Sequence, residues 1–355
     1  MPIAQSPAAP PARSPVASSP SAAAAVEARR DTRGAGAGSA SASASALASA
    51  SASASDAGRR LGRALVELLD EPDAFVRELR EGYGRLADPT HAAELQRVAP
   101  GVGACLGVRT PVQTAVLRAL GGRVRQATAA ECLWLAERLR REPQHEVRSL
   151  ALPLLRRSLE DDPERSWQLL RQLGRAAGCW VDVDELARVY ALGILLETYR
   201  WAELEQLVYS PSAWERRLVG STIASLPFEV VPRDRPRLAA GSPALELVST
   251  LVGDADPAVQ KSLAWALRSW CRVDPEDVER LLADETERSI AERDGNRAWV
   301  VRATLGAIPA GTAAALRARL HGLRRGPRDT SRAHAAARAF ADLIATAPPA
   351  EEQFA

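Results

Sequence analysis

The stretch Asp256-Pro-Ala-Val-Gln-Lys-Ser-Leu-Ala-Trp265 has the features of a helix start followed by a buried helix face. An acid before a proline supplies an N-cap and a preset first helical residue, and the apolar residues that follow recur at helical spacing. Similar stretches occupy residues 142–151 (Glu-Pro-Gln-His-Glu-Val-Arg-Ser-Leu-Ala) and 210–219 (Ser-Pro-Ser-Ala-Trp-Glu-Arg-Arg-Leu-Val), and residues 297–305 form a looser copy. The chain therefore repeats one type of helix.

A basic residue follows the start of each copy: Arg148, Arg217, Lys261 and Arg302. The later intervals fit a helical-hairpin repeat of about 40–47 residues, and the first, longer interval fits two short repeats. Stacked hairpins align equivalent residues along one concave surface, where a row of cations would match a phosphate backbone. Salt bridges within each repeat are the alternative explanation for these basic residues, and repeat spacing alone does not exclude it.

Composition supports an all-α solenoid of HEAT-like helical repeats with a concave basic groove. Ala, Leu, Arg and Glu, all good helix formers, dominate the chain after residue 57, and no apolar run reaches the length needed to cross a membrane. The formal net charge is only +2, so the protein is not a uniformly basic nucleic-acid binder. The four cysteines and four histidines show no metal-ligand spacing, and we expect neither a metal nor a cofactor.

Composition also divides the chain into two segments. Residues 1–57 are rich in Pro, Ala, Ser and Gly, which bury too little apolar area to offset chain entropy, and we expect a disordered tail. Residues 58–350 form the predicted repeat domain. The low-complexity run after Arg29-Arg30 is not apolar enough for an export signal, so we expect a cytoplasmic, nucleoid-associated protein.

One tryptophan and one carboxylate carry the chemical signal. Trp180 and Asp184 are four residues apart and share a face if one helix includes both, whereas Asp182 points elsewhere as a cap or first-turn acid. An indole beside a carboxylate suits a sugar cation, since the ring packs on deoxyribose and the charge stabilises C1′. A core tryptophan and a capping acid are the alternative. Trp214 and Trp265 also lie on predicted inner helices and have basic neighbours.

Three segments resemble the DNA alkylation repair enzymes of the AlkD type: Trp-x-x-Val-Asp at 180–184, Ser-x-Trp-x-x-Arg at 212–217 and Gln-Lys-x-x-x-Trp-x-Leu-Arg at 260–268. Leu-Gly-Val-Arg-Thr-Pro at 106–111, Leu-Trp at 133–134 and His-Glu-Val-Arg-Ser-Leu-Ala-Leu at 145–152 are also similar to that family. The resemblance covers residues 100–300 and extends less clearly over 58–350. Val181 and Asp182 depart from the family pattern, and residues 231–237 look like an insertion.

The resemblance implies a monofunctional DNA glycosylase that hydrolyses the N-glycosidic bond of cationic N3- or N7-alkylated purines in duplex DNA without base flipping. Asp184 would be the catalytic carboxylate that stabilises the sugar cation and its attacking water, and Trp180 and Trp265 would contact the deoxyribose. Arg217 and Arg268 match phosphate-binding arginines, while Arg148, Trp214 and Lys261 are DNA contacts from the repeat argument. A cationic base is already a good leaving group, so no second acid or metal is needed.

Two other functions fit the same sequence. The first is a relative that binds DNA structure without cutting the glycosidic bond, and the second is a HEAT scaffold for another protein. The scaffold would need an exposed apolar ridge on its inner helices instead of arginines with interspersed tryptophans. We expect a monomer that acts on duplex DNA with alkylated bases and does not associate with a membrane.

Overall fold

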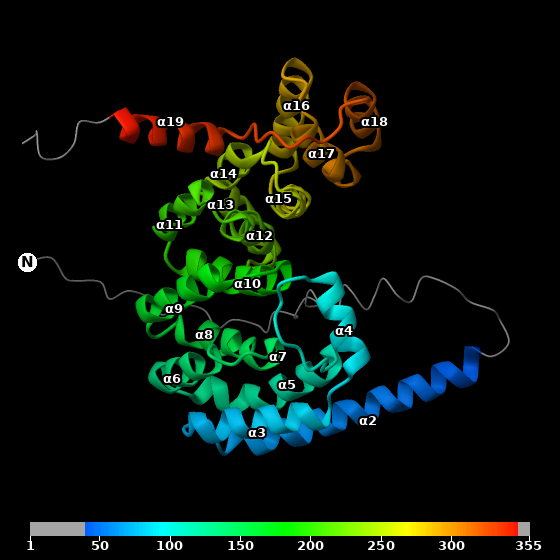
Figure 1. Cartoon of the computed structure of the whole chain (residues 1–355), viewed down its shortest axis with the longest axis vertical. Helices are drawn as coiled ribbons and strands as arrows, with labels where there is room; N and C mark the ends of the chain where they lie inside the picture. The colour runs from blue at the N-terminus through cyan, green and yellow to red at the C-terminus, as the bar shows by residue number, and fades with distance from the viewer. Residues whose placement is uncertain (1–39, 347–355) are drawn as a thin grey trace, which may run out of the picture.

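The computed structural model describes residues 40–346 and shows pairs of helices stacked in chain order (Figure 1). Within that range no strand forms, and the one β-bridge joins Ala104 to Gln144. The colours of Figure 1 follow the stack from blue at the N-terminal end to orange near the C-terminal end. The predicted all-α helical-repeat fold is therefore confirmed. None of the described helices is both long enough and apolar enough to cross a membrane.

The first layer of the stack contains the long helices that pack side by side through most of the chain. Each contacts the next one in the series, and α12 packs extensively against both of its neighbours. The members of this layer are α2 (Ala40–Val66), α5 (Thr110–Gln126), α8 (Ala151–Ser158), α10 (Trp180–Leu196), α12 (Ala213–Glu229), α15 (Pro257–Trp270) and α17 (Gly295–Thr304).

The second layer packs against the first and completes each hairpin. Many of its helices begin with an acid followed by proline, as at Asp162-Pro163 and Asp274-Pro275, where the Asp side chain accepts a backbone N–H of the first turn. Its members are α3 (Pro72–Arg85), α6 (Ala129–Leu139), α9 (Pro163–Ala176), α11 (Arg200–Gln206), α14 (Ala244–Leu251), α16 (Pro275–Ala291) and α18 (Ala310–Arg319).

Shorter elements connect or extend the layers. In Figure 1, α4 stands beside the stack between α5 and the start of α10, and α19 leaves the top of the stack. The segment interpreted as an insertion, residues 231–237, forms a 3-10 turn and the start of a short helix. These elements are α4 (Pro89–Val98), α7 (His145–Arg148), α13 (Arg235–Ala240), α19 (Arg332–Thr346) and the 3-10 turns η1 (Leu207–Tyr209), η2 (Pro232–Asp234) and η3 (Leu305–Ala307).

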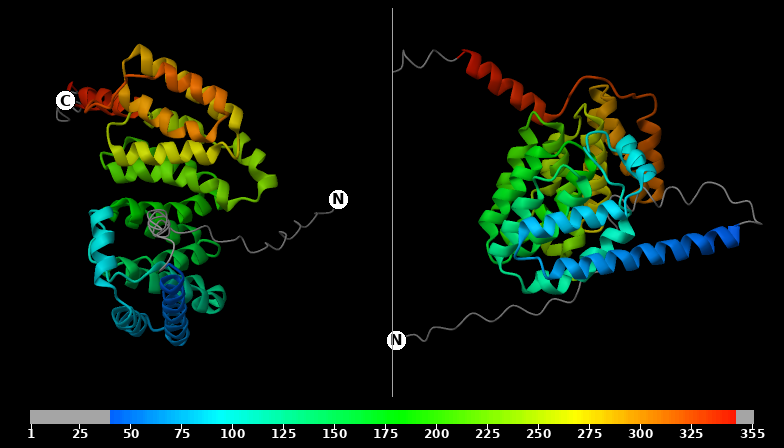
Figure 2. Two further views of the ribbon diagram at one scale, coloured as in Figure 1. Left: turned by 90° about the vertical axis from the view of Figure 1, so that its right-hand side faces the viewer. Right: turned by 60° about the horizontal axis from the view of Figure 1, so that its bottom comes forward.

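The first described helix corrects the predicted tail. Residues 40–57, expected to be disordered, belong to α2, whose N-terminal half projects beyond the stack (Figure 2). The Ser-Ala alternation is rich in the best helix former and runs without a break into the packed end of the helix. There Gly58 and Gly62 let α2 approach α5 so closely that a Cβ would lie 2.7 Å from the carbonyl oxygens of Val112 and Val116. Residues 1–39 of the predicted tail lie outside the described residues.

A second difference concerns the predicted helix 145–158, which is split into α7 and α8. Pro153 has no N–H, and its ring clashes with the carbonyl of Ser149 in a continuous helix. The break falls at Ser149 and Leu150. As a result, α7 is a single turn, and its side chains serve as anchors for other segments.

The apolar side chains form one large core that runs through both layers. A separate small cluster joins the end of α4 to the start of α10 through Leu95, Ala99, Val102, Cys179 and Val181. The half-buried Trp180 packs against this second cluster. The start of α10 is thus held from the side by α4 and the segment that follows it.

Candidate functional site

Asp184 lies in the second turn of α10, and its carboxylate binds α12. Arg217 donates from Nε (3.1 Å) and Nη2 (3.0 Å) to Oδ1 and from Nη2 to Oδ2 (2.8 Å), and Ser221 Oγ donates to Oδ1 at 2.7 Å. The side chain of Asp184 is 11% exposed and that of Arg217 is 7% exposed. Oδ1 therefore accepts from three donor atoms, while Oδ2 accepts from one and keeps room for another.

Arg217 also reaches a third helix, because its Nη1 donates to the backbone oxygen of Ala258 in the first turn of α15 at 2.7 Å. All three side-chain nitrogens of this buried arginine thus have protein acceptors. The prediction that Arg217 contacts DNA phosphate does not fit this geometry. Arg217 instead holds the Asp184 carboxylate of α10 in position and links α10, α12 and α15. We call Arg217 and Asp184 the Asp184 clamp.

Trp180 is the first residue of α10, so Trp180 and Asp184 are one helical turn apart on the same helix, as the spacing predicted. Its indole Nε1–H donates to the backbone oxygen of Val98 at 3.0 Å, at the end of α4. The hydrogen bond and the apolar cluster fix the ring's orientation, while part of the ring stays exposed. Sequence reasoning did not foresee that α4 holds this tryptophan.

The segment between α4 and α5 is fixed to α7 by Glu146. This carboxylate is 1% exposed and accepts three consecutive backbone N–H groups, from Leu106 (3.0 Å), Gly107 (2.7 Å) and Val108 (3.2 Å). Gly107 has φ +78°, and a Cβ there would lie 2.1 Å from the oxygen of Asp88, so only glycine fits. The structure thus brings together residues 106–111 and 145–152, which are two separate motifs in the sequence.

The same segment touches the chain just before Trp180. Gly101 has φ +94°, and a Cβ there would lie 2.3 Å from the oxygen of Gly178. The two backbones can approach this closely only because both residues lack side chains. The position of Trp180 therefore depends on the segment that Glu146 anchors.

His145 joins α7 to the first turn of α10. Its Nδ1 lies 3.0 Å from Asp182 Oδ1 and its Nε2 lies 3.9 Å from Glu185 Oε2, and its side chain is 6% exposed. Burial opposes protonation, but the hydrogen bond to Asp182 and the charges of Glu185 and Asp182 outweigh it, so the pKa of His145 lies above its usual value. Asp182 is the first-turn acid that the sequence predicted, and its partners are side chains of another repeat.

The raised pKa of His145 predicts a pH-dependent stability. The folded protein holds a proton that the unfolded chain releases near pH 6.5, so this stabilisation is complete below about pH 6.5 and is lost as the pH rises through the higher folded pKa. We expect the slope of unfolding free energy against pH, measured by urea denaturation between about pH 6 and 9, to become shallower in His145→Asn. The exposed His321 is the control, and His321→Asn should keep the wild-type slope. Equal slopes in His145→Asn and wild type would contradict the assignment.

The basic residue of the repeated helix start has a structural role. Arg148 Nη1 donates to the backbone oxygens of Glu142 (3.3 Å) and Pro143 (3.1 Å), and its Nη2 lies 3.5 Å from Asp182. Arg216 does the same with the oxygens of Ser210 and Pro211 and with Asp254. The equivalent of Arg148 is therefore Arg216 and not Arg217. The prediction that Arg148 contacts DNA is not supported, since its guanidinium is used to bind the preceding loop and the next repeat.

Two thiols lie beside this network. Burial raises the pKa of Cys105 and of Cys179 to about 12, so both remain protonated at neutral pH. Neither is suited to nucleophilic catalysis. Among the described residues, no group of three or more His, Cys, Asp or Glu side chains could hold a metal ion.

Comparison with known proteins identifies the family of this chain. A model of the DNA alkylation repair enzyme family matches residues 79–299, more than half of the chain. The chain belongs to the DNA alkylation repair enzyme family. A search of curated proteins finds no match. A solved structure, described as a predicted DNA alkylation repair enzyme from Enterococcus faecalis, is similar with 16% identity and a TM-score of 0.46, covering 56% of this chain and 89% of the other.

In this member of the family, the matched residues include the Asp184 clamp, Trp180 and all of α15. Lys261, Trp265 and Arg268 of α15 are spaced by four and three residues and therefore share one side of the helix. Lys261 is exposed and has no ion pair or hydrogen bond within residues 40–346, and Arg268 is exposed with its Nη1 bound to the oxygen of Ala303 at 2.9 Å. Trp265 is half-buried between them.

The structure brings some of the predicted site residues of this family member onto adjoining helices. Trp180 and Asp184 are on α10, Trp214 is in the first turn of α12, and Trp265 is on α15, and these three helices pack side by side. The half-buried Trp214 packs against the large core. Three neighbouring helices thus carry aromatic, acidic and basic residues, as a DNA-repair role expected from the family would require.

Proposed function

We propose that the protein is a monofunctional DNA glycosylase that removes cationic N3- and N7-alkylated purines from duplex DNA. The observation that carries the proposal is the Asp184 carboxylate, which α12 holds through both oxygens, while Oδ2 accepts a hydrogen bond from only one donor, Arg217 Nη2. A negative charge fixed in this way stabilises positive charge that develops at C1′ of the lesion's deoxyribose and orients the attacking water.

The proposed reaction requires few groups. The bond from C1′ to the base nitrogen breaks, and its electron pair neutralises the cationic base, which leaves without protonation. A water molecule on Asp184 Oδ2 attacks C1′ and gives its proton to the carboxylate or to solvent. Trp180 and Trp265 contact the deoxyribose, and the base need not enter a pocket of the protein.

In this proposal, the side of α15 that carries Lys261, Trp265 and Arg268 binds the DNA. Lys261 and Arg268 contact phosphates, Trp265 and Trp214 contact the sugar and backbone, and Arg148 and Arg217 position protein groups. Duplex DNA with alkylated bases is the partner, and we propose a monomer that acts on the nucleoid in the cytoplasm. No cofactor enters the proposed reaction.

The test is release of free base. The full chain is incubated with duplexes that contain N7-methylguanine or N3-methyladenine, and free base is separated by chromatography. The proposal requires release above the spontaneous rate. Duplex binding without release would instead support a protein that binds DNA structure without catalysis, a second candidate favoured by the ion pair that Asp184 already makes. Absence of both binding and release would support the scaffold.

Removing the cations of α15 should weaken DNA binding in a salt-dependent manner. For Lys261→Gln and Arg268→Gln we expect the slope of log K against log salt to fall by about one per residue, because each phosphate contact releases counterions. The measurement is duplex affinity by fluorescence anisotropy over a salt series. Arg118→Gln removes an exposed charge of α5 and should leave the slope unchanged. An unchanged slope in both α15 variants would place the DNA elsewhere.

A further inference from the structure

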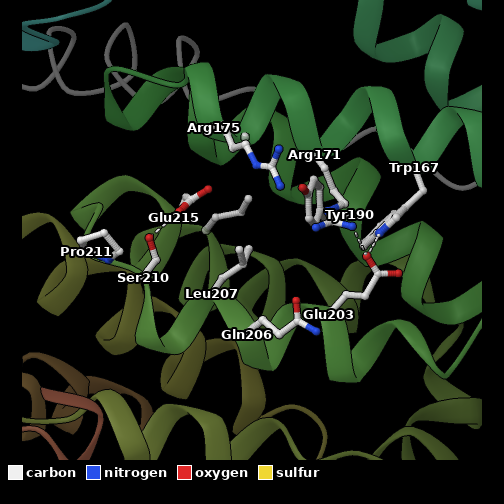
Figure 3. Close-up of a pocket in the computed structure, with 12 residues that line it drawn as sticks. Trp167, Arg171, Arg175, Tyr190, Glu203, Gln206, Leu207, Ser210, Pro211 and Glu215 are labelled. Atoms are coloured by element: carbon white, nitrogen blue, oxygen red, sulfur yellow. Dashed lines mark hydrogen bonds and ion pairs between the residues drawn. The ribbon is translucent and has the colours of Figure 1, made fainter. Parts of the chain in front are cut away.

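A cavity of about 260 Å³ lies between α9, α10, α11 and α12 (Figure 3). None of Trp180, Asp184 and Trp265 lines it. Its wall carries two arginines from α9, a tyrosine from α10 and two glutamates, so it is polar as well as apolar. The proposed glycosylase reaction makes no use of these residues.

Tyr190 is 2% exposed, yet its hydroxyl makes no hydrogen bond within residues 40–346. The hydroxyl is reached through the cavity, so a water molecule or a ligand there can accept its hydrogen bond. The ring is fixed against Trp167, with ring centroids 4.5 Å apart. Gly174 leaves the space beside the hydroxyl open, because a Cβ there would lie 3.2 Å from Oη. The hydroxyl is thus a fixed polar group that opens into the cavity.

Burial raises the pKa of Tyr190, so its hydroxyl stays protonated and can donate a hydrogen bond. The nearby charges are those of Arg171, Arg175, Glu203 and Glu215. In Figure 3 the guanidinium of Arg175 points to the same part of the cavity as the Tyr190 hydroxyl. Arg175 makes no ion pair within the described part of the chain.

Two other charges of the cavity, those of Arg171 and Glu203, pair with each other. Arg171 Nη1 lies 3.2 Å from Glu203, which also accepts the indole N–H of Trp167 at 2.8 Å. Glu215 accepts the hydroxyl of Ser210. Glu215 makes no ion pair within residues 40–346, so the cavity holds one cation and one carboxylate without ion pairs, Arg175 and Glu215, and one hydroxyl without a protein acceptor, that of Tyr190.

We propose that this cavity binds a small organic anion, whose carboxylate or phosphate group lies between the Arg175 guanidinium and the Tyr190 hydroxyl. Both groups donate hydrogen bonds, and a charged donor prefers an ionised oxygen. The volume is just below the range of drug-sized ligand pockets, which fits a small metabolite. The free oxygen of Glu215 on the opposite wall can accept an N–H or O–H of the same ligand.

Isothermal titration calorimetry of the full chain tests the site, with succinate and inorganic phosphate as probes at constant ionic strength. We expect saturable one-site binding of at least one probe by wild type. Arg175→Gln and Tyr190→Phe should each weaken it about tenfold or more, since a hydrogen bond to a charged group contributes roughly 1.5–3 kcal/mol. Tyr190→Phe keeps the ring on Trp167, so its fold should survive, as thermal unfolding can verify. Arg77→Gln on α3 is the matched charge control and should bind like wild type.

Three results would overturn the proposal. The first is absence of binding of both probes to wild type. The second is equal weakening by Arg77→Gln, which would reveal general electrostatic attraction instead of a site. The third is displacement of the bound probe by an unmodified DNA duplex together with weaker duplex affinity in Arg175→Gln, which would make the cavity part of the DNA surface. Binding of succinate alone or phosphate alone supports the site and tells which anionic group it prefers.

Discussion

Asp184→Asn is expected to slow release of N7-methylguanine from duplex DNA by roughly 10²–10³-fold, the effect of removing one preorganised group that stabilises a developing charge. Asn keeps the shape of the side chain but has no charge to offset the sugar cation. Duplex affinity should change little, because Lys261 and Arg268 are untouched. Single-turnover kinetics with excess protein measures the chemical step, and anisotropy measures binding.

The same change also affects the fold, and this effect must be separated from catalysis. Asp184→Asn leaves Arg217 buried without its counter-charge, which costs about 3–5 kcal/mol in comparable buried pairs. Circular dichroism at the assay temperature gives the folded fraction, and rates are corrected by it. A variant that is mostly unfolded would show that Asp184 is needed for structure and would leave catalysis to the next comparison.

Arg217→Gln provides that comparison. It breaks the same ion pair and destabilises α10, α12 and α15 in a similar way, but it keeps the negative charge of Asp184. If the carboxylate acts on the sugar, Arg217→Gln retains more base release per folded molecule than Asp184→Asn. Equal loss in both variants would contradict a catalytic role and leave the pair as a structural link. Ser221→Ala removes only one hydrogen bond to Oδ1 and should have the smallest effect.

The fold was largely predictable from the sequence because its signals are local. An acid followed by proline marks helix starts such as Asp162 and Asp256, and helical spacing of apolar residues marks the buried faces. Where prediction failed, a tertiary or steric effect decided. Pro153 splits the helix at 145–158. In α2, packing on α5 at Gly58 and Gly62 anchors the helix that the Ser-Ala run continues outward.

The roles of the basic residues were less predictable. Spacing correctly found that the helix starts recur, but it could not say which acceptor each guanidinium would reach. Arg148 binds carbonyl oxygens of a loop and a carboxylate 34 residues away, and Arg217 binds a carboxylate 33 residues earlier in the chain. Neighbouring arginines at 216 and 217 also allowed an alignment that was wrong by one residue. Only the three-dimensional packing distinguishes a buried clamp from an exposed phosphate contact.

A large effect on stability is also expected at Glu146, which sequence reasoning did not single out. Glu146→Ala leaves the backbone N–H groups of Leu106, Gly107 and Val108 buried without an acceptor, and we expect a loss of roughly 3–5 kcal/mol in the free energy of unfolding. Urea denaturation followed by circular dichroism measures this loss. Glu160→Ala, at an exposed acid after α8, should change the value by less than about 0.5 kcal/mol.

Glu146→Gln tests the hydrogen bonds of this side chain while its size is kept. The amide oxygen can still accept from Gly107 and Val108, but the amide NH₂ then faces the N–H of Leu106, so the loss should be smaller than in Glu146→Ala. In this folded variant, hydrogen exchange at residues 106–108 and at the Trp180 indole should accelerate together, because Gly101 and Val98 link that segment to the start of α10. Fast exchange at 106–108 with an unchanged indole would show that the segment and Trp180 are independent. Only if the two change together does the anchor on α7 also control the aromatic contact proposed for the lesion's sugar.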